Sequence, residues 1–82
     1  MPTLIRSARQ LGNLIQRTRR QRGLNQSQLA DLAGLRQEMV SAIERGHDGT
    51  KLATLHALLA ALDLDLLVDQ RNSGPDDMAD LF

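Results

Sequence analysis

The sequence contains no cysteine, no tryptophan and no tyrosine, and its single aromatic residue is Phe82. Without thiols it has neither a disulfide framework nor a thiolate metal site. With a single aromatic side chain it lacks the platform on which many proteins stack single-stranded nucleic acid. No apolar run approaches the roughly 18 residues that a membrane span requires, and the N-terminus does not have the pattern of a signal peptide. These absences predict a soluble, cytoplasmic protein without a cofactor.

Charge is unevenly distributed along the chain, although the net charge is zero. Residues 1–62 carry nine basic and four acidic side chains, a net charge of +5, whereas residues 63–82 carry one basic and six acidic side chains, a net charge of −5. A basic front suits a polyanionic partner, and an acidic rear suits a different one. Both parts could instead be merely solvated faces, but the charge changes sign where the hydrophobic pattern also changes.

The first two predicted helices have clear start and stop signals. Ser7 is a good N-cap for a helix that runs to about Arg22, and Gly23 follows as a stop. Asn25 is the expected N-cap of the second helix, because Gln28, three residues later, completes a capping box. The positions of the first three helices predicted to face the core are Leu11, Leu14, Ile15, Thr18, Leu29, Leu32, Ala33, Val40 and Ile43.

A tight turn at Gly34 separates the second helix from a third at about residues 37–45. Arg36 occupies the N-cap position of this third helix, where Ser, Thr, Asn or Asp would be more stable. A local rule broken at a helix start often marks a functional site. Two short helices joined by such a turn form a helix-turn-helix, which places its second helix in the DNA major groove.

The fourth helix is predicted to run from an N-cap at Thr50 to about Leu62. A stripe of leucines on it could be mistaken for a zipper, but it spans fewer than two heptads and is better explained as domain core. The stripe consists of Leu52, Leu55, Leu58, Leu59 and Leu62.

Beyond residue 62 the hydrophobic period becomes two, which predicts a β-strand over residues 63–70. Its apolar face consists of Leu64, Leu66 and Val68. One short strand is not stable alone in water, and no second strand is evident. The strand could pair antiparallel with its copy across the two-fold axis of a homodimer, or the segment could pack on its own domain.

Residues 71–82 form an acidic tail that we expect to be flexible in isolation, because it lacks the apolar content to fold. The tail nevertheless ends in Leu81 and Phe82. Such an apolar end can dock on a protein partner or be recognised by a protease. It can also be a frayed terminus.

The segment GLNQSQLADLAGLRQEMVSAIERG resembles the lambda-repressor-like, or XRE, helix-turn-helix family, and the resemblance covers roughly residues 11–62. Within this family the chain is most similar to HipB-type antitoxins, the DNA-binding partners of HipA-type kinase toxins. That similarity rests on the first helix, the Arg36-Gln37 pair, the segment LDLDLLVDQRN and the acidic tail with its aromatic end. It implies an all-α DNA-binding domain of four to five helices, with a short C-terminal β-strand that pairs across a homodimer.

The resemblance implies that the third helix reads bases through Arg36, Gln37, Glu38 and Ala42. Arg36 can donate two hydrogen bonds to guanine, and Gln37 can make a bidentate contact with adenine. Glu38 would repel phosphate unless it accepts from the N4 amine of cytosine or is held by a nearby Arg. Met39 replaces the usual Ser or Thr, and either packs on a thymine methyl or folds back.

Phosphate contacts are expected on both sides of the third helix. The free amides at the start of the second helix can bind an anion, and Gln26 and Ser27 add side-chain donors. Arg45 and Lys51 lie around the turn before the fourth helix, where the resemblance also implies phosphate contacts. Such contacts set register rather than sequence.

The resemblance further pairs Arg19 with Glu44 as a bridge between the first and third helices. Such a bridge would hold the recognition helix at its angle. Removal of one partner of a buried ion pair costs about 3–5 kcal/mol, although neither side chain needs to touch a base.

No enzyme site is evident. His47 and His56 lack the partners that a zinc site needs, and GHDGT lacks the spacing of a phosphate loop. The sequence therefore predicts a non-enzymatic, sequence-specific repressor that is the antitoxin of a type II toxin–antitoxin system. It would bind a palindromic operator through residues 1–62 and form a homodimer through residues 63–70. It would also bind and neutralise a HipA-like kinase toxin, which Leu81 and Phe82 are expected to contact. The alternatives are a stand-alone phage-like repressor and a helix-turn-helix protein that binds only a protein partner.

Overall fold

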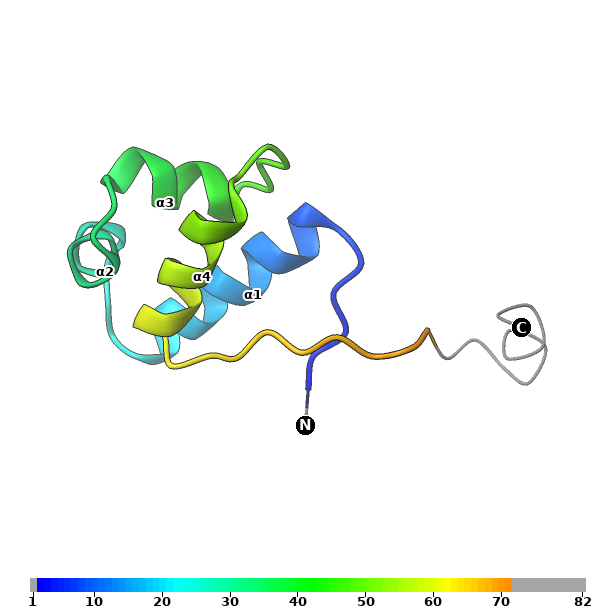
Figure 1. Ribbon diagram of the computed structural model, residues 1–82. Helices are drawn as coiled ribbons and strands as arrows, with labels where there is room; N and C mark the ends of the chain where they lie inside the picture. The colour runs from blue at the N-terminus through cyan, green and yellow to red at the C-terminus, as the bar shows by residue number, and fades with distance from the viewer. Residues whose placement is uncertain (1, 72–82) are drawn as a thin grey trace.

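The structure, a computed structural model, describes residues 2–71. Figure 1 shows four α-helices: α1 (Ala8–Gln21), α2 (Gln26–Ala33), α3 (Gln37–Glu44) and α4 (Leu52–Ala61). The four predicted helices are confirmed, and none of them is long and apolar enough to cross a bilayer. The toxin contact predicted at Leu81 and Phe82 lies outside the described residues.

The ends of α1 and α2 follow the local signals of the sequence. Ser7 caps α1 by accepting a hydrogen bond from the backbone N–H of Gln10. Asn25 and Gln28 form the complete capping box at the start of α2, with each side chain accepting from the backbone N–H of the other residue at 2.7 and 2.8 Å. Gly34 ends α2 with φ +71°, a left-handed conformation that favours glycine.

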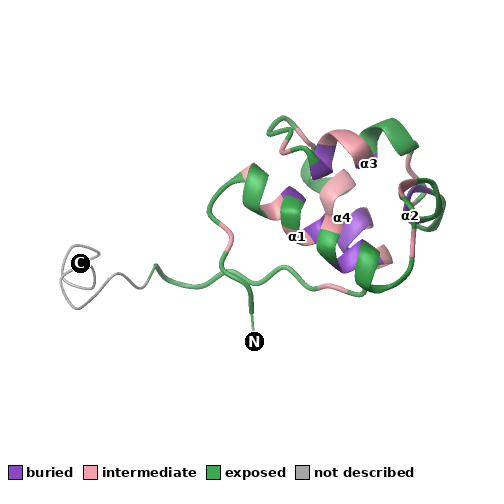
Figure 2. Ribbon diagram, turned by 180° about the vertical axis from the view of Figure 1, so that it is seen from behind, coloured by how far each residue is buried: buried purple, intermediate pink, exposed green. Residues whose placement is uncertain are grey.

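The core is a cluster of apolar side chains drawn from all four helices and the residue after α4, and Figure 2 colours the buried positions of the helices purple. The α3 helix packs on α1 and α2, and α4 packs on α2. This arrangement leaves α3 along one edge of the molecule, with its outer face free of other elements (Figure 1). The buried apolar residues are Ile15, Leu29, Ala30, Val40, Ile43, Leu58, Leu59 and Leu62.

Three predictions about individual positions were wrong. Leu32 is 63% exposed, because the buried arc of α2 is centred between Leu29 and Ala30 and a residue three positions after Leu29 falls about 60° outside it. Leu52 is 62% exposed, because it begins α4. Lys51 rather than Thr50 is the N-cap of α4, and no side chain caps that helix.

Leu62 is the C-cap of α4, and Asp63 follows in the left-handed region with φ 59°. The N–H of Asp63 donates to the carbonyl of Ala60, and that of Leu64 donates to the carbonyl of Leu59. Because Asp63 belongs to this helix termination, an extended strand can begin no earlier than Leu64. Residues 64–71 then run outward (Figure 1), and within residues 2–71 of the single chain no strand forms.

Candidate nucleic-acid interface

The start of α3 is exposed to solvent over four consecutive residues. Arg36, Gln37, Glu38 and Met39 are all exposed, and the buried residues of α3 begin only at Val40. Figure 2 shows the same change along α3 from an exposed beginning to a half-buried and buried end. The α3 helix therefore presents its N-terminal turn outward while its later residues anchor it in the core.

Arg36 is the N-cap of α3, and its side chain makes no capping hydrogen bond. The helix start is therefore not optimised for stability, as the sequence predicted. Ala42, one turn into the helix, is half-buried rather than exposed. Its small side chain leaves room for close approach but limits its own contact with a base to the methyl group.

Beneath this surface, Arg19 of α1 and Glu44 of α3 form a buried ion pair. The guanidinium donates from Nε to Oε2 at 2.7 Å and from Nη2 to Oε1 at 3.1 Å. A third hydrogen bond runs from Arg19 Nη1 to the carbonyl of Leu24, at 2.7 Å. Arg19 and Glu44 retain only 7% and 6% of their exposure. Removal of either charge would leave the other buried without a charged partner.

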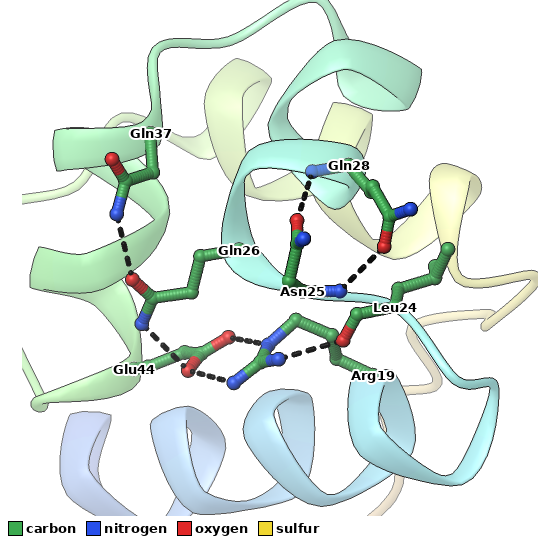
Figure 3. A network of polar contacts seen from close by, with 7 residues as sticks. All are labelled: Arg19, Leu24, Asn25, Gln26, Gln28, Gln37 and Glu44. Carbon is green, nitrogen blue, oxygen red and sulfur yellow. Dashed lines mark hydrogen bonds and ion pairs between the residues drawn. The ribbon is translucent and has the colours of Figure 1, made fainter.

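The ion pair continues toward α3 through two glutamines (Figure 3). Gln26 of α2 donates from Nε2 to Glu44 Oε1 at 3.1 Å, and Gln37 of α3 donates from Nε2 to Gln26 Oε1 at 3.1 Å. The network thus joins α1, α2 and α3 and ends at the first residue of α3. One Gln37 N–H is used, which leaves its second N–H and its carbonyl oxygen for the two hydrogen bonds that adenine accepts and donates.

This link between Gln26 and Gln37 was missed by the sequence analysis, which treated one as a phosphate contact and the other as a base reader. The residues are 11 positions apart on different helices, so no helical spacing indicates their contact. Only the folded arrangement of α2 against α3 brings the two amides together.

The start of α2 offers a second group of donors. The Asn25 side chain accepts from the N–H of Gln28, whereas the N–H groups of Gln26 and Ser27 belong to the first turn, where a helix supplies no acceptor. Ser27 is exposed. An anion placed there would meet free backbone amides and the positive end of the helix.

The third group of predicted contacts lies after α3. Arg45 is exposed, and its guanidinium donates to the hydroxyl of Ser41. Lys51 is exposed at the start of α4. A groove of about 280 Å³ lies beside Lys51, and Met39, which is 42% exposed, forms part of its lining. The groove is lined by Met39, His47, Gly49, Thr50, Lys51 and Thr54.

Comparison with known proteins agrees with this geometry. Residues 15–68 match the helix-turn-helix family HTH_3. The chain is 37% identical over 73 residues to Antitoxin HipB of Escherichia coli (strain K12), which covers 88% of this chain and 83% of that protein.

Solved structures show the same fold. A chain of the HipA-HipB-O2-O3 complex aligns with a TM-score of 0.80 and 32% identity, covering 87% of this chain and all of that chain (100%). The restriction-modification controller protein C.AhdI from Aeromonas hydrophila aligns with a TM-score of 0.66 and 33% identity, covering 71% of this chain and 88% of that one.

Proposed function

We propose that this chain is a sequence-specific repressor and the antitoxin of a type II toxin–antitoxin system. The chain belongs to the helix-turn-helix family and is a relative of Antitoxin HipB. The observation that carries the DNA-binding part is the exposed start of α3, held from below by the network that runs from Arg19 to Gln37. A surface held by three helices loses little conformational freedom when it binds.

In the proposed complex, α3 enters the major groove with its N-terminus first. Arg36 makes a bidentate contact with guanine O6 and N7, and Gln37 contacts the edge of an adenine. Glu38 accepts from the N4 amine of a cytosine, the base group that suits a carboxylate. Ala42 makes the remaining base contact, through its methyl group.

The sugar-phosphate backbone would be held on both sides of α3. On one side, the amides of Gln26 and Ser27 and the Ser27 hydroxyl donate to a phosphate. On the other side, Arg45 and Lys51 supply two cations, and Lys51 lines the same groove as Met39. These contacts fix the register of α3 on the duplex, and the base contacts then determine which sequence is preferred.

The operator is proposed to be palindromic and to be bound by a homodimer, with half-sites about one helical turn apart. The second copy would pair through the segment that contains Leu64, Leu66 and Val68, for which residues 2–71 of the single chain supply no partner strand. Pairing would satisfy backbone groups that otherwise remain open to water and would cover exposed apolar side chains.

The antitoxin role comes from the HipB relatives and from the HipA-HipB-O2-O3 complex, in which a similar chain occurs together with HipA. We propose by this analogy that the chain binds and neutralises a HipA-like kinase toxin in the cytoplasm. A stand-alone regulator is the second candidate, favoured by the similarity to the controller protein C.AhdI.

One experiment tests both parts of the proposal. The tagged full-length chain is isolated from its own cells after crosslinking, and the bound DNA and bound proteins are identified separately. Recovery of one palindromic sequence together with a kinase supports the antitoxin. Recovery of the palindrome without a kinase supports the stand-alone regulator, and a protein partner without enriched DNA would refute DNA binding.

A further inference from the structure

Apolar side chains become progressively more exposed along the segment after α4. Leu64 still packs against the core, Leu66 is 48% exposed, Leu67 is 68% exposed and Val68 is 94% exposed. The beginning of the segment borders a groove of about 400 Å³ between the segment and the end of α4. The groove is lined by His56, Leu59, Ala60, Asp63, Leu64, Asp65 and Leu66.

Symmetry restricts how this segment can pair with its copy. Residues directly opposite each other in an antiparallel pair project to the same face, and successive residues of a strand alternate between faces. A two-fold axis perpendicular to the plane of the paired strands places each residue on the same face as its copy. One residue must therefore lie on the axis opposite its copy, and the choice of that residue determines every other pair.

An axis at Leu66 gives the best apolar match. It places Leu66 opposite its copy and Leu64 opposite the partner's Val68, so that one face of the pair consists of apolar side chains. The partner's Val68, nearly fully exposed in the single chain, would then cover Leu64 beside the groove at the end of α4. Burial of apolar area is the main driving force for such association.

Charge does not oppose this register. On the other face, Asp65 lies opposite the partner's Leu67. Asp63 would come near the partner's Asp69, but Asp63 lies in the left-handed helix termination and not in the extended ladder. No two acidic residues of the ladder therefore face each other, an arrangement that would be destabilising.

The neighbouring registers are less favourable. An axis at Leu67 sets Asp65 against the partner's Asp69 twice and leaves Leu64 opposite Gln70. An axis at Val68 sets Asp65 against the partner's Arg71 but places Leu66 opposite Gln70. Exposed ion pairs contribute little in water compared with the burial of leucine side chains.

We propose that two copies of this chain pair antiparallel with Leu66 on the two-fold axis, and that the partner's Val68 packs over Leu64 at the mouth of the groove lined by Leu59 and Ala60. This inference rests on the proposed homodimer and adds its register. The register also fixes the spacing of the two recognition helices, because each copy of α3 is attached to the same rigid helical domain.

The absence of native cysteine permits a direct test with single-cysteine variants of the full chain. The variants Leu66→Cys, Leu67→Cys and Val68→Cys are oxidised under mild conditions, and the covalent dimer is measured on non-reducing gels. In the proposed register the two Cα atoms at position 66 lie about 4.5–5.5 Å apart, within the range of a disulfide. Those at position 68 lie at least roughly 13 Å apart. We expect Leu66→Cys to crosslink at least tenfold faster than Val68→Cys.

A mixture of Leu64→Cys and Val68→Cys provides a second measurement that leaves Leu66 unchanged. Each protein alone should remain uncrosslinked, whereas the mixture should yield the disulfide between positions 64 and 68. The helical signal in circular dichroism shows whether the Leu64→Cys protein is folded. The crosslinking of Leu66→Cys tests the register independently of the Leu64→Cys protein.

Sedimentation of the wild-type and reduced variant proteins separates the register from the homodimer. If the protein is dimeric but crosslinks fastest at position 67 or 68, the proposed register is wrong and the proposed homodimer still holds. A wild-type protein that sediments as a monomer at tens of micromolar, alone and with its operator, would overturn both.

Discussion

Gln26 of α2 donates a hydrogen bond to the buried carboxylate of Glu44 of α3, at 3.1 Å and across 18 positions of sequence. The same oxygen accepts from Arg19 Nη2, also at 3.1 Å. Gln26 is thus fixed at one end by a buried ion pair and holds Gln37 at the other. The proposed base-reading turn of α3 and the internal support of the domain are parts of one hydrogen-bond network.

Replacing Gln26 with Ala should weaken both operator binding and folding. The change removes the hold on Gln37, whose side chain must then be ordered during binding at a cost of about 0.5–1.5 kcal/mol. The change also removes the two hydrogen bonds of the Gln26 side chain, to Glu44 and from Gln37, each of which should contribute about 0.5–1.5 kcal/mol to the free energy of unfolding. Fluorescence anisotropy with operator DNA and urea denaturation measure the two effects. Gln21→Ala, at an exposed position near the end of α1, is the control, and an equal loss of affinity in it would contradict this role of Gln26.

Glu44→Gln tests the ion pair beneath the network. The substitution keeps the size of the side chain but leaves the guanidinium of Arg19, 7% exposed, without its charged partner. We expect the free energy of unfolding to fall by about 3–5 kcal/mol, as when one member of a buried ion pair is removed. Thermal and urea denaturation followed by circular dichroism provide the measurement. A loss below about 1 kcal/mol would place Arg19 in contact with water, as in a surface ion pair.

Arg36→Ser should separate stability from function. Serine is a preferred N-cap, and Arg36 makes no capping hydrogen bond, so that the variant should be more stable by about 0.5–2 kcal/mol. It should also lose about 1–3 kcal/mol of discrimination at one base pair of the operator. Denaturation measures the change in stability. Binding to a set of operators in which each base is changed in turn measures the change in discrimination. A variant that keeps wild-type specificity would show that Arg36 does not read a base.

Much of the fold could be predicted because its signals are local. Ser7, the Asn25–Gln28 capping box and Gly34 each act within a few residues, and all three are found where expected. The contact between Gln26 and Gln37 could not be predicted, because it depends on how α2 packs against α3. Leu32 misled the prediction for a similar reason: in an eight-residue helix the apolar pattern does not determine which arc is covered.

Lys51→Ala should weaken binding to all duplexes by a similar factor. An exposed lysine at the start of α4 that contacts a phosphate contributes charge but no sequence information. The slope of log K against log salt should therefore decrease by about one. Titrations between low and physiological salt, with operator and unrelated DNA, test this. Arg71→Ala is the matched control, because it removes one positive charge from the segment after α4, and an unchanged slope for Lys51→Ala would exclude the phosphate contact.

Gly12 is buried on α1 at the point where the backbones of α1 and α3 meet, a contact that no local sequence signal indicates. A Cβ atom added there would lie 2.4 Å from the carbonyl oxygen of Ile43 and 2.7 Å from that of Glu44. Both neighbours are backbone atoms of the recognition helix, so that Gly12→Ala must displace α3 rather than a flexible side chain.

In an exposed helix the same change would be stabilising by about 1 kcal/mol. Here overpacking should cost about 1–3 kcal/mol and outweigh that gain. The displaced α3 would also carry Glu44 away from Arg19, so that we expect the variant to lose both stability and operator affinity. Denaturation and anisotropy titrations measure the two losses. Asn13→Ala, at an exposed neighbouring position of α1, should change neither by more than about 0.5 kcal/mol. If Gly12→Ala proves as stable as the wild-type protein and binds as tightly, α3 is not held by this close backbone contact, and the network of Arg19, Glu44 and Gln26 alone must determine its position.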